Sequence, residues 1–312
     1  EVLTRKALRP EREILGLSST QNVIHVILDE LQAGVFEEIL KNNRNYSEAL
    51  DGFTYFSNTT SSFPTTIMSI PAIFSGQIYQ NNVPMEDFID KTYKGRTIPN
   101  VLYDHGYEVD LAASLDWYAK SHYSHWFEIP VPYGLTWEEN RDAQAALMLD
   151  MAFYRSSPQV IKEVIFGSHI GSVLGKGETS ITAYEAKRHF AHENFLEELV
   201  ADSFVGSEKP AYKFFHFNTT HYPAVLNAEC KDSGQVLPWA WPNIKIQATC
   251  CFAQFMEYIE KLKALNVYDS SLIIIQADHG YYKVPESAEN VRLRNADHFP
   301  DNEFKSKEYF AK

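Results

Sequence analysis

The amino-acid sequence predicts an α/β fold of three layers, in which helices cover both faces of a mainly parallel central sheet. Three nearly continuous apolar runs carry this prediction, because each is typical of a buried parallel strand and helical segments separate them. These runs are residues 21–28 (QNVIHVIL), 212–217 (YKFFHF) and 271–277 (SLIIIQA). The chain has no internal repeat and no low-complexity linker, so we expect one domain over residues 1–312.

The other predicted elements alternate along the chain. Apolar residues at helical spacing predict helices over 33–41, 65–74, 96–105, 141–154, 182–204 and 246–265. Short strands are predicted at 53–56 and 108–112. The stretch 114–133 is aromatic and irregular, so it is either a loop beside a substrate or a set of aromatic side chains packed on the surface.

The composition is that of an acidic globular protein. Hydrophobic residues make up 45% of the chain and charged residues 22%, which excludes disordered and fibrous classes. Lysine and arginine number 28 against 41 for aspartate and glutamate, a formal net charge of −13. This balance argues against a nucleic-acid partner, which would need a basic face. A phosphate-bearing substrate stays compatible, because a bound metal ion can reverse the local charge.

Three features of the sequence bear on the compartment in which the protein works. No apolar run approaches the roughly 18 residues that span a bilayer. The chain begins with charged residues, without an initiating Met or a signal peptide, so we expect a processed or shortened form whose membrane anchor has been removed. Cys230 can form a disulfide with Cys250 or with Cys251, or all three are buried free thiols; they form no C-x-x-C pair that would indicate a zinc site.

Polar side chains follow three of the predicted strands where each strand ends. Asp29 and Glu30 end the first strand, Asp278 and His279 end the last, and His221 comes just after residues 212–217. Ligands of open α/β sheets gather at the carboxyl ends of the strands. One acidic residue there is usually a loop cap, but two carboxylates with an imidazole suit a divalent metal and leave a fourth ligand position open.

The segment 57–76 (SNTTSSFPTTIMSIPAIFSG) supplies a candidate nucleophile. Thr65 and Thr66 lie at the start of its predicted helix, where free backbone N–H groups favour a phosphate or sulfate. A threonine hydroxyl is a poor nucleophile at neutral pH, and metal coordination is one way to lower its pKa. The alternative is an ordinary threonine that caps the helix.

These motifs resemble the alkaline phosphatase/sulfatase superfamily, and most closely its phosphoethanolamine transferase and lipoteichoic acid synthase branch. The resemblance covers most of the chain, through NVIHVILDE, TTIMSIPAIFSG, GYEVDL, NTTHYP and, most specifically, YDSSLIIIQADHG. It implies an alkaline phosphatase-like sandwich in which Asp29, Asp278 and His279 are metal ligands. It also implies that Thr66, placed nine residues before Ser75, is the nucleophile and a further ligand, with Thr65 as the alternative.

The resemblance implies substrate-binding residues as well. His221, in the THYP motif, matches the histidine that contacts the substrate phosphate, and His298 is the candidate for a second one after Gly280. Glu30 is either a second metal ligand, as in calcium-type sulfatases, or a helix cap that faces solvent. The local disulfide of some transferases is not expected, because Ser62 and Ala72 stand at the flanking positions.

The activity that the resemblance implies is a metal-dependent transfer. A phospho-head group would move from a phospholipid to a glycan or polymer acceptor through a phospho-threonine, with one divalent metal, zinc before manganese or calcium. The protein would be a monomer on the extracytoplasmic side (periplasmic or cell-surface) of a bacterial inner membrane, tethered by N-terminal transmembrane helices.

Two other readings of the same residues stay open. A hydrolase of phosphate or sulfate esters would use the same site, although a typical arylsulfatase is disfavoured because SFPTT lacks the Arg of the C/S-x-P-x-R motif. An inactive lipid-binding or sensory relative would lack the nucleophile or the ligands, and all four core positions are present here.

Overall fold

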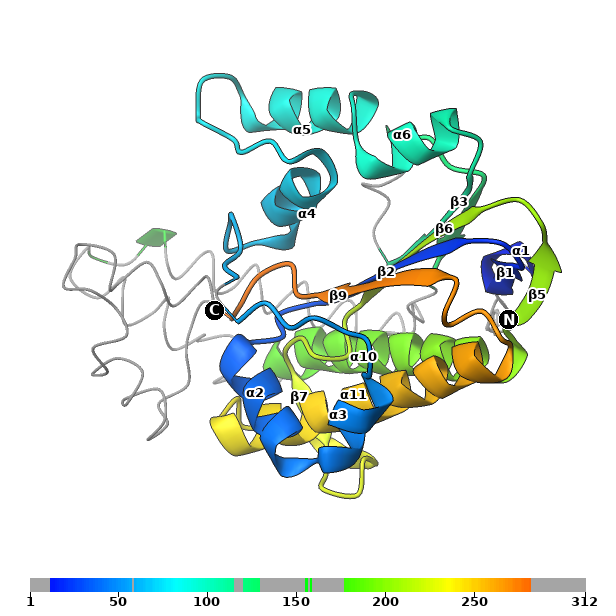
Figure 1. Ribbon diagram of the computed structural model, residues 1–312. Coiled ribbons are helices and arrows are strands. Elements are labelled where there is room, and N and C mark those ends of the chain that lie inside the picture. Colours follow the sequence, from blue (N-terminus) through cyan, green and yellow to red (C-terminus); the bar gives the residue numbers. More distant parts are fainter. Residues whose placement is uncertain are drawn as a thin grey trace, which may run out of the picture.

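The centre of the molecule is a sheet of five strands (Figure 1). The computed structural model describes residues 12–57, 59–114, 120–129, 155–156, 158 and 177–281. In spatial order the strands are β4 (His125–Glu128), β3 (Glu108–Ala113), β6 (Ala211–Phe217), β2 (Asn22–Leu28) and β9 (Ser271–Gln276). Every neighbouring pair is parallel, so the carboxyl ends of all five strands lie at one edge of the sheet.

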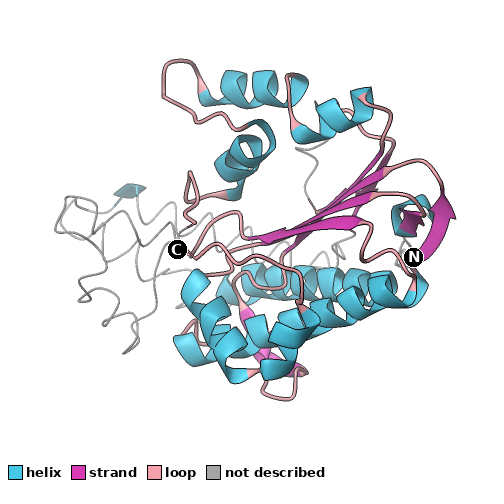
Figure 2. Cartoon of the chain, viewed as in Figure 1, coloured by secondary structure: helices cyan, strands magenta, loops and turns pink. Residues whose placement is uncertain are grey.

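Helices cover both faces of this sheet, which confirms the predicted three-layer α/β fold (Figures 1 and 2). One face carries α4 (Thr66–Ser75), α5 (Met85–Lys94) and α6 (Ile98–Asp104). The other carries α2 (Ala33–Asn42), α3 (Arg44–Ala49), α10 (Gly177–Asp202) and α11 (Trp241–Ala264). Smaller elements lie outside the main sheet: α1 (Arg12–Leu15), the parallel pair β1 (Gly16–Ser18) and β5 (Phe204–Ser207), and the antiparallel pair β7 (Ala224–Leu226) and β8 (Asp232–Leu237).

The alternation of side chains along β2 divides the interior into two cores. Ile24 and Val26 pack with α2, α10 and α11, whereas Ile27 packs with Met68 and Phe74 of α4. Successive side chains of a strand point to opposite faces, so a strand with helices on both sides must be apolar throughout. This is why the run at 21–28 is almost continuous.

Some expected elements differ from the structure. Residues 53–56 form a loop rather than a strand, because no strand of the described part of the chain pairs with them, and Phe56 is 74% exposed. The aromatic stretch contains β4, which the sequence did not indicate. The helix expected over 141–154 lies outside the described residues, and the single domain over 1–312 stays a prediction.

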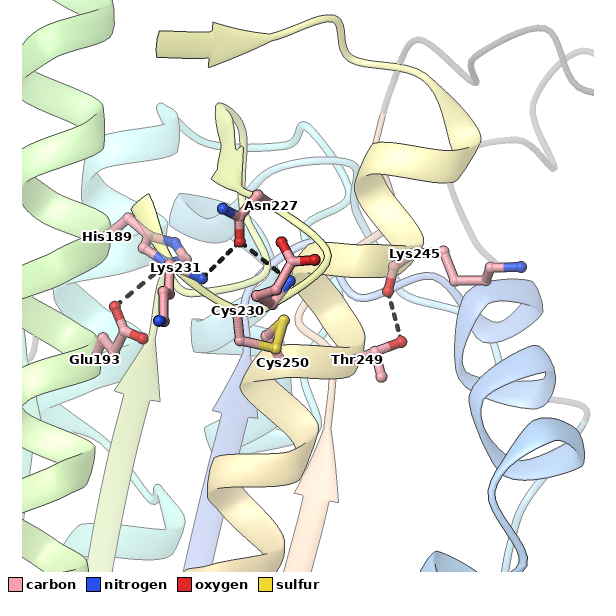
Figure 3. Close-up of a disulfide and its surroundings, with 9 residues drawn as sticks. His189, Glu193, Asn227, Cys230, Lys231, Lys245, Thr249 and Cys250 are labelled. Atoms are coloured by element: carbon pink, nitrogen blue, oxygen red, sulfur yellow. Dashed lines mark hydrogen bonds and ion pairs between the residues drawn. A yellow bond between two sulfur atoms is a disulfide. The ribbon is translucent and has the colours of Figure 1, made fainter. Parts of the chain in front are cut away.

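A disulfide decides between the alternatives for the cysteines. Cys230, between β7 and β8, is bonded to Cys250 of α11, with 5.4 Å between the two Cα atoms (Figure 3). Cys251, the next residue, is a buried free thiol. The bond fixes the β7–β8 connection to α11, and Asn227 tightens that connection by accepting a hydrogen bond of 3.0 Å from the backbone N–H of Lys231.

None of the helices in the described ranges is both long enough and apolar enough to cross a membrane.

Candidate active site

Two carboxylates and an imidazole meet at the carboxyl edge of the sheet. Asp29 follows β2, Asp278 follows β9, and His216 lies near the end of β6; one ligand atom of each lies within 4.8 Å of the other two. The strand register explains the meeting. Ile27 is paired with His216 on one side and with Gln276 on the other. Asp29 comes two residues after Ile27, and Asp278 comes two residues after Gln276. Residues two apart share a face, so all three side chains point to the α4 side.

His216 is the member of this group that the sequence did not single out. It lies inside the run YKFFHF, where every residue is buried, and a histidine in such a run is typical of a satisfied core position. Its Nε2 lies 3.4 Å from Oδ2 of Asp29. The signal that could have found it is its position one residue before the end of a predicted strand, because the carboxyl ends of parallel strands share one edge of the sheet.

His279 joins the carboxylates to the candidate nucleophile. Its Nε2 lies 3.4 Å from Oδ2 of Asp278, 3.7 Å from Oδ1 of Asp29 and 3.1 Å from Oγ1 of Thr66. Thr66 is the first residue of α4, whereas Thr65 before it is exposed and its side chain makes no capping hydrogen bond. The structure therefore brings together Asp29, Asp278, His279 and Thr66, and it leaves Thr65 outside the cluster.

The charges at this point fit a divalent cation. Oδ1 of Asp29 and Oδ2 of Asp278 are buried and have no hydrogen-bond partner among the described residues. Burial, and next the charge of Asp29, raise the pKa of Asp278. Burial also acts to raise the pKa of Asp29, but the charge of His221 and the contact with His216 outweigh it and lower that pKa. Two facing buried carboxylates repel each other, and oxygen and nitrogen donors of this kind suit zinc or manganese.

Glu30 lies beside the cluster and is buried, which rules out the alternative of a helix cap that faces solvent. Helix α2 begins only at Ala33, and Glu30 itself has a left-handed backbone with φ of 61°. Its carboxylate faces the interior, where Oε1 lies 3.5 Å from Nε2 of His221. Burial raises the pKa of Glu30 to about 7. The three-residue cation cluster does not include Glu30.

His221 faces the same site from the loop after β6. Burial alone would lower the pKa of His221, but the carboxylates of Asp29 and Glu30 raise it above its ordinary value. Nδ1 of the ring lies 2.6 Å from the carbonyl oxygen of Tyr222, and the backbone oxygen of His221 accepts a hydrogen bond from Gln247 of α11. These contacts hold the imidazole of His221 next to the cluster. His298 lies outside the described residues, so its role stays a prediction.

Comparison with solved structures gives several relatives at low identity. A protein of the alkaline phosphatase superfamily from Vibrio parahaemolyticus is 11% identical, with a TM-score of 0.45, over 86% of this chain and 56% of the other. The lipoteichoic acid synthase LtaP from Listeria monocytogenes is 13% identical, with a TM-score of 0.45, over 96% and 65%. The C-terminal periplasmic domain of EcEptC from Escherichia coli is 12% identical, with a TM-score of 0.47, over 88% and 72%.

The chain thus spans less than two thirds of the length of the first two of these structures. No curated protein matches it. A model of the sulfatase family matches residues 21–306, which include Asp29, Thr66 and the pair Asp278 and His279. Because this match runs over most of the sequence, the chain belongs to the sulfatase family of enzymes.

Proposed function

We propose that the protein transfers a phospho-head group, of the phosphoethanolamine or phosphoglycerol type, from a phospholipid to a glycan or polymer acceptor. The observation that carries this proposal is the position of the Thr66 hydroxyl, 3.1 Å from His279 and at the start of α4. A helix start offers unpaired N–H groups to a phosphate. A threonine there can carry a phosphoryl group, whereas it cannot be oxidised to the formylglycine that sulfatases use.

The residues that would hold the ion are Asp29, Asp278, His279 and the Thr66 hydroxyl, with His216 as a further nitrogen donor. Zinc fits this mixed nitrogen and oxygen set best, with manganese or calcium as alternatives. When bound, the ion lowers the pKa of a hydroxyl and neutralises charge on a phosphoryl oxygen.

The transfer takes two displacements at phosphorus. In the first, Thr66 Oγ1 forms a bond to the phosphorus of the donor, the bond from phosphorus to the diacylglycerol oxygen breaks, and diacylglycerol leaves with one proton. In the second, an acceptor hydroxyl forms the new bond to phosphorus, the Thr66 oxygen leaves, and it regains a proton. His221 contributes its positive charge to the phosphate and moves the proton, and His298 is the predicted second histidine for this task.

The disulfide supports an extracytoplasmic location. Bonds such as Cys230–Cys250 persist in oxidising compartments and are rare in the cytosol of most organisms. A phospholipid donor requires proximity to a membrane, and we propose that the domain works as a monomer on the outer side of a bacterial inner membrane, tethered by an N-terminal anchor.

A hydrolase of phosphate or sulfate esters is the second candidate, and the match to the sulfatase family favours it. The same residues would act, with water in place of the acceptor hydroxyl in the second displacement.

Intact mass after incubation with vesicles tests the proposal. Vesicles of phosphatidylethanolamine or phosphatidylglycerol would be mixed with the wild-type protein, with Thr66→Ala and with the matched control Thr65→Ala, and bound metal would be measured by elemental analysis. We expect one bound ion, and a head-group phosphate added to the wild type and to Thr65→Ala but not to Thr66→Ala. An unmodified protein that cleaves p-nitrophenyl phosphate or sulfate would favour the hydrolase. A protein with neither metal nor modification would be the inactive relative, and the proposal would fail.

A further inference from the structure

A chain of three hydrogen bonds ends on the carboxylate of Asp29. Nε of Arg188 donates to Oγ of Ser114 over 3.2 Å, and Oγ of Ser114 lies 3.3 Å from Oδ1 of Asn218. Nδ2 of Asn218 then donates to Oδ2 of Asp29 over 2.7 Å. We call these four residues the Asp29 relay.

The chemistry of the four groups gives the relay one direction. The Nε–H of Arg188 can only donate, so Ser114 accepts there and its own hydroxyl hydrogen is left for Asn218. The amide of Asn218 then turns its oxygen to Ser114 and its NH2 group to Asp29. The opposite orientation of this amide would place its oxygen against a carboxylate oxygen, which is repulsive. A cation at one end and an anion at the other both favour the observed orientation.

The relay crosses the edge of the sheet where the candidate site lies. Ser114 follows β3, Asn218 follows β6 and Asp29 follows β2, and these are three neighbouring strands. Arg188 reaches them from α10. Asn218 is 3% exposed, and its backbone N–H donates to Nδ1 of His192 over 3.3 Å, so both its main chain and its side chain are held.

The two oxygens of Asp29 consequently have different surroundings. Oδ2 accepts the hydrogen bond from Asn218, whereas Oδ1 has no hydrogen-bond partner among the described residues and lies 3.7 Å from Nε2 of His279. We propose that Asn218 is a positioning residue for Asp29, with Ser114 and Arg188 fixing the direction of its amide. It keeps Oδ1 toward the position of the cation. This inference rests on the metal centre of the proposed function.

The expected effect of breaking the relay is a loss of metal affinity with the fold intact. Residues that orient a ligand typically contribute about tenfold to hundredfold to metal affinity. Asn218→Leu keeps the shape of the side chain and removes both of its hydrogen bonds. Ser114→Ala removes the link between Arg188 and Asn218, whereas Ser114→Thr keeps the hydroxyl. Ser124→Ala is the matched control, because Ser124 accepts a hydrogen bond of 3.1 Å from the N–H of Val109 at the other end of β3.

The test measures the dissociation constant of Zn²⁺ by competition with a chelating dye, together with the unfolding temperature of each metal-free variant. We expect Asn218→Leu and Ser114→Ala to weaken Zn²⁺ binding by about tenfold to hundredfold, and Ser114→Thr and Ser124→Ala to bind as the wild type does. If the metal-free variants unfold at the same temperature as the metal-free wild type, their weaker Zn²⁺ binding does not come from a general loss of structure.

Two outcomes would overturn the inference, and they differ. If the wild type binds Zn²⁺ and both relay variants bind it equally well, Asn218 does not position Asp29 and the proposed function is untouched. If the wild type binds no Zn²⁺, Mn²⁺ or Ca²⁺, the metal centre of the proposed function fails and the relay has no ligand to orient.

Discussion

The hydroxyl of Thr66 lies 3.1 Å from Nε2 of His279, although 213 positions separate the two residues in the chain. The contact joins the first residue of α4 to the loop after β9, a strand at the edge of the sheet. Helix α4 is held by the core on its side of the sheet, and β9 is held by its pairing with β2. The contact between Thr66 and His279 therefore depends on the tertiary fold, and interactions between neighbours in the sequence could not bring the two residues together.

Glu30→Gln should lower the rate of head-group transfer by about tenfold or more. The substitution keeps the shape of the side chain and removes the carboxylate that lies 3.5 Å from His221, and an opposite charge at such a distance favours the protonated form of the imidazole that the proposed transfer uses. The measurements are kcat and metal content, with the partly exposed Glu37→Gln as control. Loss of the metal in Glu30→Gln would contradict this prediction and would make Glu30 a ligand.

Asp110→Asn should destabilise the protein by about 3 to 5 kcal/mol, because it leaves a buried charge without its partner. Asp110 is fully buried between Lys213 and His125, which occupy the matching positions of the two neighbouring strands. Urea unfolding measures the loss. Asp90→Asn is the control, since Asp90 forms exposed ion pairs and its replacement should change stability little. Equal midpoints for the two variants would contradict the prediction.

Replacing both Cys230 and Cys250 by Ser should lower the free energy of unfolding by about 3 kcal/mol. The disulfide closes a loop with a sequence separation of 20, and the chain-entropy model gives a loss of that size for such a loop. Urea unfolding with and without a reductant measures it. The reductant should weaken the wild type by a similar amount and leave the double variant unchanged; a reductant effect on the double variant would mean that the loss has another source.

Acid should destabilise the protein through His25. This residue is buried in β2, with Nδ1 3.0 Å from the hydroxyl of Tyr212, and burial lowers the pKa of His25 from 6.5 to about 4. The unfolded chain therefore binds a proton below pH 6.5 that the folded protein takes up only near pH 4, and stability falls as the pH drops through this window. The contribution of His25 is about 2 kcal/mol between pH 7.5 and pH 5.

Urea unfolding of the wild type and of His25→Phe at these two pH values measures that contribution. The variant should lose less stability on acidification, whatever its stability at pH 7.5. A pH dependence that is identical in both proteins would show that other buried groups, such as His192, account for the acid sensitivity.

The sequence predicted the parallel sheet and much of the candidate site for one physical reason. The carboxyl ends of parallel strands lie at one edge of the sheet, so Asp29 after the first strand and the pair Asp278 and His279 after the last were expected at that edge once the runs were identified as strands of one parallel sheet. The helix start indicated both Thr65 and Thr66, and the resemblance to the superfamily selected Thr66 of the two. What the sequence could not supply was the strand order, and with it the opposition of Ile27 to His216.

The residues that sequence reasoning missed act through nonlocal contacts. Asn218, Ser114 and Arg188 are ordinary polar residues in the sequence, and their relation to Asp29 exists only after β3, β6 and β2 are placed side by side. Glu30 has a left-handed backbone and a buried carboxylate, and no pattern of neighbouring residues indicated either. The wrong strand at 53–56 has the same origin, since a strand needs a partner that local sequence does not reveal.

The position of β2 between β6 and β9 also sets the order in which the protein can mature during synthesis. Strand β2 leaves the ribosome long before β6 and β9, its two neighbours in the sheet, and parallel pairing between strands so far apart in the sequence forms slowly. Thr66 and Asp29 therefore meet His279 only after the chain has been synthesised through β9 and the loop that follows it. A half-synthesised chain carries Asp29 and the candidate nucleophile Thr66 without Asp278 and His279, so the cluster is completed only after β9 has been made.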